Sequence, residues 1–92
     1  MQTNQELQFI NSTSSRMLLV LEPRSSEFWI ERGATVKVLI REPSSIHSLD
    51  VEYLVGGLVV YAHNADQIEV YKNGLRLPHD KQTRRMAGKL TN

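Results

Sequence analysis

The sequence predicts an all-β fold: a small antiparallel β-sandwich or barrel of seven or eight short strands, followed by a basic C-terminal tail that is disordered or weakly helical. Three observations lead to this fold class. Apolar and polar residues alternate with a period of two, as they do in half-buried strands. Turn-forming residues separate these runs at a spacing of ~8–12 residues, which is typical of sandwiches and barrels. An Asn-Gly pair between two runs indicates a tight hairpin.

The expected strands are of two kinds. Five runs are short or alternate between apolar and polar residues: 7–10, 28–30, 33–41, 49–55 and 67–71. Two others, 17–21 and 58–62, are continuously apolar and therefore predict strands that are covered on both faces. The reversals between strands are short, and a parallel crossover needs about a dozen residues or more, so we expect antiparallel pairing.

The clearest local signal is Asn73-Gly74, which lies between alternating apolar residues in the stretch 70–77. Both residues adopt positive φ at low cost, as a type I′ turn requires. We therefore expect a hairpin here. Pro78 should end its second strand, because proline cannot donate a hydrogen bond to a sheet.

The domain organisation follows from length and charge. The chain has 92 residues, and we expect residues 1–80 to form a single β domain and residues 81–92 a basic tail. Residues 1–71 carry five cations and nine carboxylates, a net charge of −4, whereas residues 72–92 carry six cations and one carboxylate, a net charge of +5. This split indicates either a basic arm on an acidic body or a solvated tail that folds back loosely on that body.

One stretch carries a resemblance. Residues 27–40, EFWIERGATVKVLI, resemble the strand, glycine and T-V-x-V strand of cupredoxin-like and immunoglobulin-like sandwiches, and they cover 14 of the 92 residues. The resemblance implies a sandwich architecture. It implies no copper site, because a blue-copper centre needs a cysteine ligand and the chain contains no cysteine.

Catalytic motifs are absent from the sequence. The lack of cysteine excludes disulfides, thiol nucleophiles and thiolate metal sites. Nucleophile-elbow, dinucleotide-binding and Walker A motifs do not occur. A small metal-dependent or hydrolytic enzyme is a second alternative, using histidines and aspartates at strand ends or in loops: His47, His63, His79, Asp50, Asp66 and Asp80. They lack a close ligand pair such as H-x-x-x-H, so we expect no catalytic residue, metal or cofactor.

Trp29 is the most informative single residue. In a strand, Phe28 and Ile30 share one face, and Trp29 lies on the other with Glu27 and Glu31, which border turns and are expected to be solvated. An exposed tryptophan here would mark a ligand or partner contact. The other interpretation places Trp29 under a loop or in the core. The binding residues that we select are Trp29, Arg24 and Arg32.

These observations favour a small non-catalytic binding or interaction module over an enzyme. The alternative is binding of nucleic acid or of an acidic partner through four cations of the tail: Lys81, Arg84, Arg85 and Lys89. Self-association through an edge strand would make the protein a homo-oligomer.

The expected cellular location follows from two features that the sequence lacks, a membrane-spanning segment and a secretion signal. No apolar run reaches the ~18 residues of a membrane-spanning helix. No charged and apolar signal segment opens the sequence. We therefore expect a cytoplasmic protein with no membrane partner.

Overall fold

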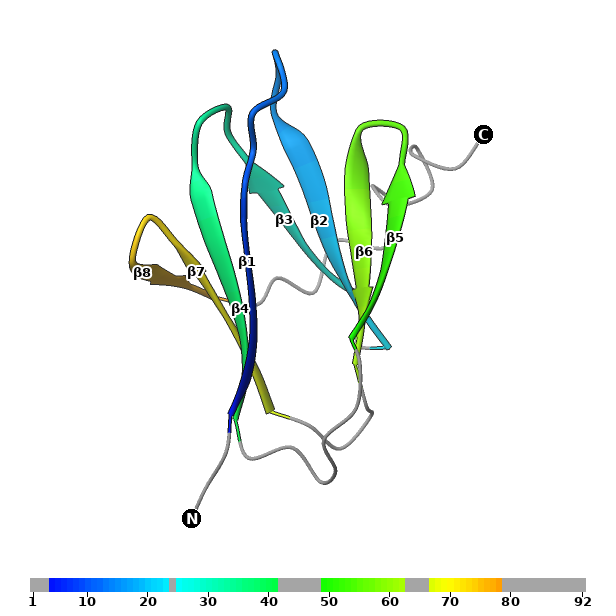
Figure 1. Cartoon of the computed structure of the whole chain (residues 1–92), viewed down its shortest axis with the longest axis vertical. Coiled ribbons are helices and arrows are strands. Elements are labelled where there is room, and N and C mark those ends of the chain that lie inside the picture. Colours follow the sequence, from blue (N-terminus) through cyan, green and yellow to red (C-terminus); the bar gives the residue numbers. More distant parts are fainter. Residues whose placement is uncertain (1–3, 24, 42–48, 63–66, 79–92) are drawn as a thin grey trace.

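The computed structural model describes residues 4–23, 25–41, 49–62 and 67–78, which form eight strands in two four-stranded sheets (Figure 1). The strands are β1 (Gln5–Ile10), β2 (Met17–Glu22), β3 (Ser26–Ile30), β4 (Thr35–Arg41), β5 (Asp50–Leu54), β6 (Gly57–Tyr61), β7 (Gln67–Lys72) and β8 (Leu75–Leu77). One sheet has the order β1-β4-β7-β8 and the other β3-β2-β6-β5. The all-β prediction is confirmed, and the architecture is a sandwich. Helices long and apolar enough to cross a membrane do not occur among the described residues.

Strand pairing is antiparallel except between β2 and β6, which run parallel from Leu18 opposite Gly57 to Glu22 opposite Tyr61. The expectation of antiparallel pairing holds for the other five pairs of described strands, and β2 with β6 is the exception. A parallel pair needs a long connection, and the chain supplies one because it forms β3, β4 and β5 before it returns as β6 beside β2.

The first strand begins earlier than the sequence predicts. Gln5 and Glu6 pair with Ile40 and Leu39 of β4, so the strand starts at residue 5 instead of residue 7. β4 is long enough to pair with the whole of β1. Two polar residues therefore join the strand through hydrogen bonds to β4, although no apolar alternation in the sequence includes them.

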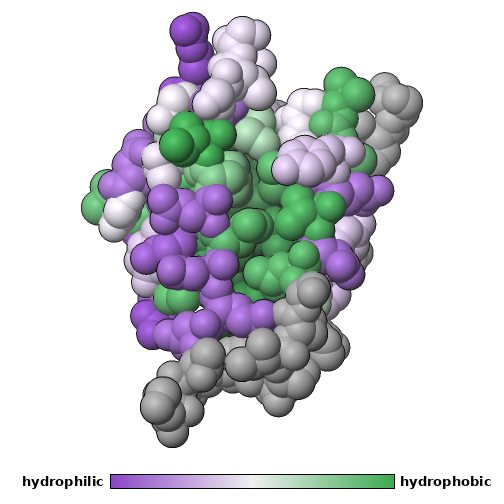
Figure 2. Space-filling model, viewed as in Figure 1, coloured by the Kyte–Doolittle hydropathy of each residue, from purple (hydrophilic) through white to green (hydrophobic). Residues whose placement is uncertain are grey.

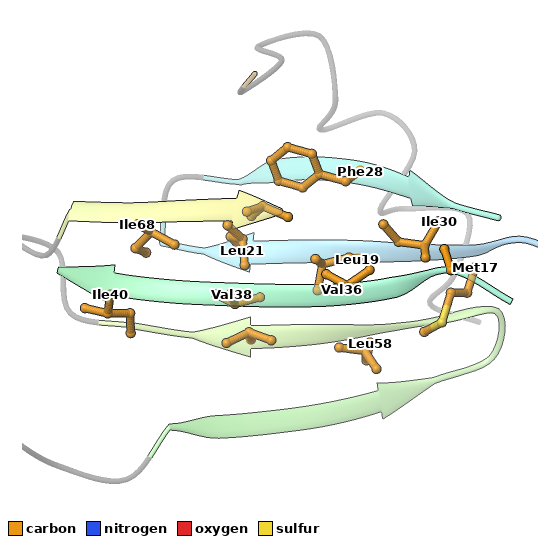
Figure 3. Packing of buried hydrophobic residues seen from close by; sticks show 13 residues of the cluster. Met17, Leu19, Leu21, Phe28, Ile30, Val36, Val38, Ile40, Leu58 and Ile68 are labelled. Carbon is orange, nitrogen blue, oxygen red and sulfur yellow. The ribbon is translucent and has the colours of Figure 1, made fainter. Parts of the chain in front are cut away.

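The core lies between the two sheets and is built from alternate residues of the inner strands (Figure 3). Met17, Leu19 and Leu21 of β2 face Val36, Val38 and Ile40 of β4 across it. The last three are alternate residues of the predicted strand 33–41, so they share one face. Phe28 and Ile30 complete the cluster from β3, with Leu58 and Val60 from β6 and Ile68 and Val70 from β7. Burial of such a side chain contributes about 1.5–3 kcal/mol relative to exposure, so this layer is the main source of stability.

The predicted hairpin joins β7 and β8. Asn73 has φ 51° and Gly74 φ 85°, and the strands pair from Lys72 opposite Leu75, as a two-residue type I′ turn requires. The turn is also attached to the next strand of the sheet. Asn73 Oδ1 accepts a hydrogen bond from the Thr35 N–H at 3.0 Å, and the Asn73 N–H donates to the Thr35 carbonyl at 2.8 Å.

Candidate functional site

The sandwich is open on one side, where the edge strands β1 and β5 face each other. In the described part of the chain β1 pairs only with β4, and β5 pairs only with β6. Between them lies a groove of about 410 Å³. Figure 2 shows apolar surface in the middle of the molecule, in the region where Figure 1 places β1 opposite β5 and β6.

The groove is lined mainly by apolar side chains from both sheets: Phe9, Ile10, Met17, Tyr53, Leu54 and Leu58. Two of them are unusually exposed for their size, since Ile10 is 61% exposed and Tyr53 81%. The inward-facing Leu7 and Val51 are only partly buried, because each lies on an edge strand. Exposed large apolar side chains that gather at one place are characteristic of binding surfaces.

One wall of the groove is the connection between β1 and β2, and Asn11 holds it in place. Asn11 is 1% exposed. Its Nδ2 donates to the Ser15 carbonyl at 3.1 Å and to the Ile30 carbonyl at 3.0 Å, and its Oδ1 accepts from the Thr13 N–H at 3.0 Å. The Asn11 side chain therefore ties the wall to the end of β3 in the opposite sheet. No sequence signal marks the contact of Asn11 with Ile30, because the two residues are 19 positions apart.

The other wall is the turn between β5 and β6. Gly56 has φ 85°, in the left-handed region that glycine adopts without strain. Its carbonyl accepts a hydrogen bond from the Leu18 N–H at 2.9 Å, which fixes the turn to the start of β2. Both walls are thus attached to the central strands, and the groove is preformed.

Trp29 lies on the opposite face of its strand from Phe28 and Ile30, outside the sandwich core, and it is half-buried. The guanidinium of Arg16 lies over its ring, 4.1 Å from the centroid, in a cation–π contact. Arg32 is exposed in the turn after β3, and Arg24 lies outside the described residues. A partner contact at Trp29, Arg24 and Arg32 stays a prediction, and the cation that contacts the indole is one that the sequence does not single out.

The two glutamates beside Trp29 differ in environment. Glu31 is exposed, and its carboxylate pairs with Lys72 at 2.8 Å; the hydrogen bond from the lysine holds the pKa of Glu31 below its usual value. Glu27 is only 4% exposed, so the expectation that it is solvated is wrong. Glu27 lies within β3, opposite Val20 of the central strand β2, so it belongs to the sheet and not to the turn that precedes it.

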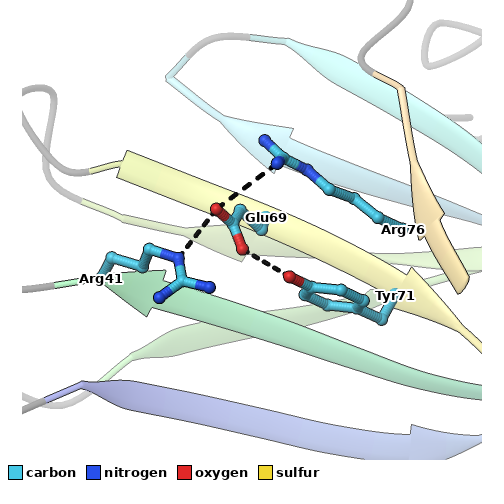
Figure 4. Close-up of polar contacts among 4 residues, drawn as sticks. All are labelled: Arg41, Glu69, Tyr71 and Arg76. Atoms are coloured by element: carbon cyan, nitrogen blue, oxygen red, sulfur yellow. Dashed lines mark hydrogen bonds and ion pairs between the residues drawn. The ribbon is translucent and has the colours of Figure 1, made fainter. Parts of the chain in front are cut away.

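The outer face of the β1-β4-β7-β8 sheet is mainly polar, and charged side chains form ion pairs across its strands (Figure 4). Glu69 accepts hydrogen bonds from Arg41 Nε at 2.8 Å and from the Tyr71 hydroxyl at 2.6 Å, and Arg76 lies 3.7 Å away. The Arg41 guanidinium, followed by the Tyr71 hydroxyl, lowers the pKa of Glu69 to about 2. A carboxylate with so low a pKa is only weakly basic, so Glu69 is a poor general base near neutral pH.

The histidines of the enzyme alternative, His47, His63 and His79, lie outside the described residues, as do the tail cations Lys81, Arg84, Arg85 and Lys89. Within residues 4–23, 25–41, 49–62 and 67–78, no three His, Asp or Glu side chains gather as metal ligands would. Asp50 is exposed at the start of β5. Metal or hydrolytic chemistry and nucleic-acid binding therefore stay predictions from the sequence.

Comparison of the chain with protein-family models, with curated proteins and with solved structures gives no match.

Proposed function

We propose that this protein is a non-catalytic interaction module that binds an extended polypeptide segment at the open edge between β1 and β5. The observation that supports this function is the apolar groove between two edge strands, with Ile10 and Tyr53 exposed at its rim. Its volume of about 410 Å³ falls within the range of ~300–1,000 Å³ that is usual for binding pockets.

Edge strands favour an extended ligand. Each presents backbone N–H and C=O groups along the side that does not face its sheet neighbour, and an added strand can pair with them. Side chains alternate along such a segment, so one set would enter the groove while the other faces solvent. The lining side chains are apolar apart from a polar wall formed by Asn11, Ser12, Thr13, Ser15 and Arg16. The segment should therefore carry apolar side chains at alternate positions.

Selection from a random heptapeptide library displayed on phage, with the full chain immobilised, tests this proposal. We expect the enriched peptides to alternate apolar and polar residues. Added to the ¹⁵N-labelled protein, a selected peptide should shift amide resonances of β1, β5 and the 11–16 connection. Enriched peptides that shift resonances elsewhere, or a library that yields no binder, would contradict the proposal.

Matched variants sharpen the test. Ile10→Lys places a charge at the rim of the groove, and we expect it to weaken binding of a selected peptide at least tenfold. Leu75→Lys is the control, because Leu75 is similarly exposed, at 73% against 61% for Ile10, but lies on β8 at the far edge of its sheet. Equal loss of binding in both variants would show that general surface charge, and not the groove, governs affinity.

A second copy of the chain is one potential source of the extended segment. In that case the protein would self-associate through an edge strand, and sedimentation velocity would show a dimer whose population rises with concentration. Ile10→Lys should then shift the protein to monomer, while Leu75→Lys should not.

A further inference from the structure

The outer face of the β3-β2-β6-β5 sheet carries a second buried apolar cluster. Leu18 is 0% exposed, Val20 3% and Val59 6%, and Trp29 and Leu54 pack around them. In a two-layer sandwich the outer face of a sheet normally faces water. Among the described residues, no strand lies over this face, because the other sheet packs on the opposite one. The packing of the two sheets therefore does not account for the burial of these residues, whereas a third layer over this face would.

Carboxylates border this cluster. The register places Val20 and Val59 side by side on the two central strands, with Glu27 next to Val20 on β3 and Glu52 next to Val59 on β5. The following row across the sheet holds Glu22 of β2, Tyr61 of β6 and Asp50 of β5. The Tyr61 hydroxyl donates to Glu52 at 2.7 Å. The surface thus combines an apolar centre with four carboxylates, and Arg16 above Trp29 lies at its other end.

The C-terminal segment 79–92 has the complementary composition. It contains four cations and one carboxylate, and its two large apolar residues, Met86 and Leu90, lie four positions apart. That spacing places both on one side of a helical turn, and in an extended chain their even separation also places both on one side. An isolated segment of 14 residues gains little from helix formation in water, so contact with the sheet would have to order it.

The segment can reach the face. The chain leaves the described part at Pro78, directly after β8. β8 is the edge of its sheet on the side away from β1. Lys72, at the end of the neighbouring strand β7, lies 2.8 Å from Glu31, which directly follows β3 of the other sheet. Four strands at a spacing of about 4.8 Å measure roughly 15 Å across. A chain of 14 residues spans up to about 45 Å, so it can cross the whole sheet.

We propose that residues 79–92 form this third layer. Met86 and Leu90 pack on the cluster of Leu18, Val20 and Val59, and the tail cations pair with the bordering carboxylates. The opposite charges of the two parts of the chain then stabilise an intramolecular contact. The outer face of the sheet binds a basic segment with two apolar side chains, and that segment belongs to the same chain. This surface shares Leu54 and Arg16 with the groove between β1 and β5, but its centre, Leu18, Val20 and Val59, does not line the groove, so its test is independent of the proposed function.

A spin label tests the proposal on the full chain. The protein has no cysteine, so Thr91→Cys gives a single labelling site next to Leu90. We expect the label to broaden amide resonances of β2, β6 and β5 and to leave those of β1 and β4 sharp. In a mixture of ¹⁵N-labelled protein and unlabelled, spin-labelled protein, no broadening should appear. Broadening of neither sheet, or broadening in the mixed sample, would overturn the proposal; the latter result would mean that a second copy covers the face.

The single tryptophan supplies a second measurement, because Trp29 packs on the same cluster. In the variant with Met86→Asp and Leu90→Asp, its emission should shift to longer wavelength and iodide should quench it more strongly. Leu75→Asp is the control, since it places the same charge on an exposed apolar residue of β8. Raised salt should enhance quenching of the wild-type protein, because it screens the pairing of the tail with the carboxylates. An emission spectrum of the double variant that equals that of the wild type would refute the contact.

Discussion

Asn11 allows the most direct test of how the groove is built, through the change Asn11→Ala. The substitution removes the bonds from Nδ2 to the carbonyls of Ser15 and Ile30, and it removes the acceptor of the Thr13 N–H. Ser15 and Thr13 are exposed, so water can replace the hydrogen bonds that the Ser15 carbonyl and the Thr13 N–H lose. The loss of these two bonds should cost about 0.5–1.5 kcal/mol together. The Ile30 carbonyl is different, because Ile30 is 0% exposed and its oxygen would lose a buried partner, at a cost of about 1–3 kcal/mol. We therefore expect a loss of about 3 kcal/mol in the free energy of unfolding.

Urea denaturation, followed by the fluorescence of Trp29 and by far-ultraviolet circular dichroism, measures this loss. With an m-value of about 1 kcal/mol per molar urea, the midpoint should fall by about 3 M. Ser12→Ala is the control, because Ser12 is exposed, and we expect a change within about 0.5 kcal/mol.

A third variant, Asn11→Asp, separates the donor from the acceptor. The aspartate keeps the oxygen that accepts from the Thr13 N–H. In place of the Nδ2 donor it puts a second oxygen, which faces the carbonyl oxygens of Ser15 and Ile30 and cannot donate to them. At neutral pH it should be at least as destabilising as alanine, and it should recover part of its stability in acid, where the carboxyl protonates and can donate. A loss below about 1 kcal/mol in Asn11→Ala, or an Asn11→Asp variant as stable as the wild type at neutral pH, would refute this account of the wall.

Three further predictions concern the sheets. Gly74→Ala should destabilise the protein by about 1–2 kcal/mol in the same urea assay, because Gly74 has φ 85° and an L side chain is strained there; an unchanged midpoint would contradict the type I′ turn. The pKa of Glu69 is lowered from 4.5 to about 2, so its ion pair stabilises the fold fully above pH 4.5 and loses this contribution as the pH falls toward 2. Glu69→Gln should therefore flatten the dependence of the urea midpoint on pH in that window, and an equally steep dependence in both proteins would exclude this role. Ile40→Ala should cost about 2–5 kcal/mol, since Ile40 is 0% exposed in the core, whereas Leu75→Ala, at a position 73% exposed, should cost less than about 0.5 kcal/mol; similar losses in both would contradict the assignment of the core.

Several features of the fold could be read from the sequence because they depend on neighbouring residues. The alternation in 33–41 places Val36, Val38 and Ile40 on one face, and the structure buries these three between the sheets. The pair Asn73-Gly74 specifies its hairpin by itself, since both residues accept positive φ. The sequence also indicates which strands are covered on both sides, because β2 and β6 are continuously apolar and both are central strands.

The candidate site was not predictable in the same way. Phe9 and Tyr53 meet at the groove although they are far apart in the chain, and nothing near either residue indicates the other. The role of Asn11 depends on a hydrogen bond to Ile30, 19 residues away. Arg16 lies over Trp29 because β2 and β3 pair, whereas the sequence suggests Arg24 and Arg32 from their proximity along the chain.

The sequence by itself determined that this chain forms a small all-β sandwich or barrel with two strands buried on both faces, because period, turn chemistry and apolar content are local properties. Tertiary structure alone decided that β2 and β6 run parallel and that β1 and β5 leave an apolar groove between two sheet edges. It also decided that Glu27 is buried and that Glu69 is held ionised. The physical reason is that strand neighbours, exposed edges and ion pairs arise from contacts between distant segments, and these contacts form only when the two sheets pack against each other.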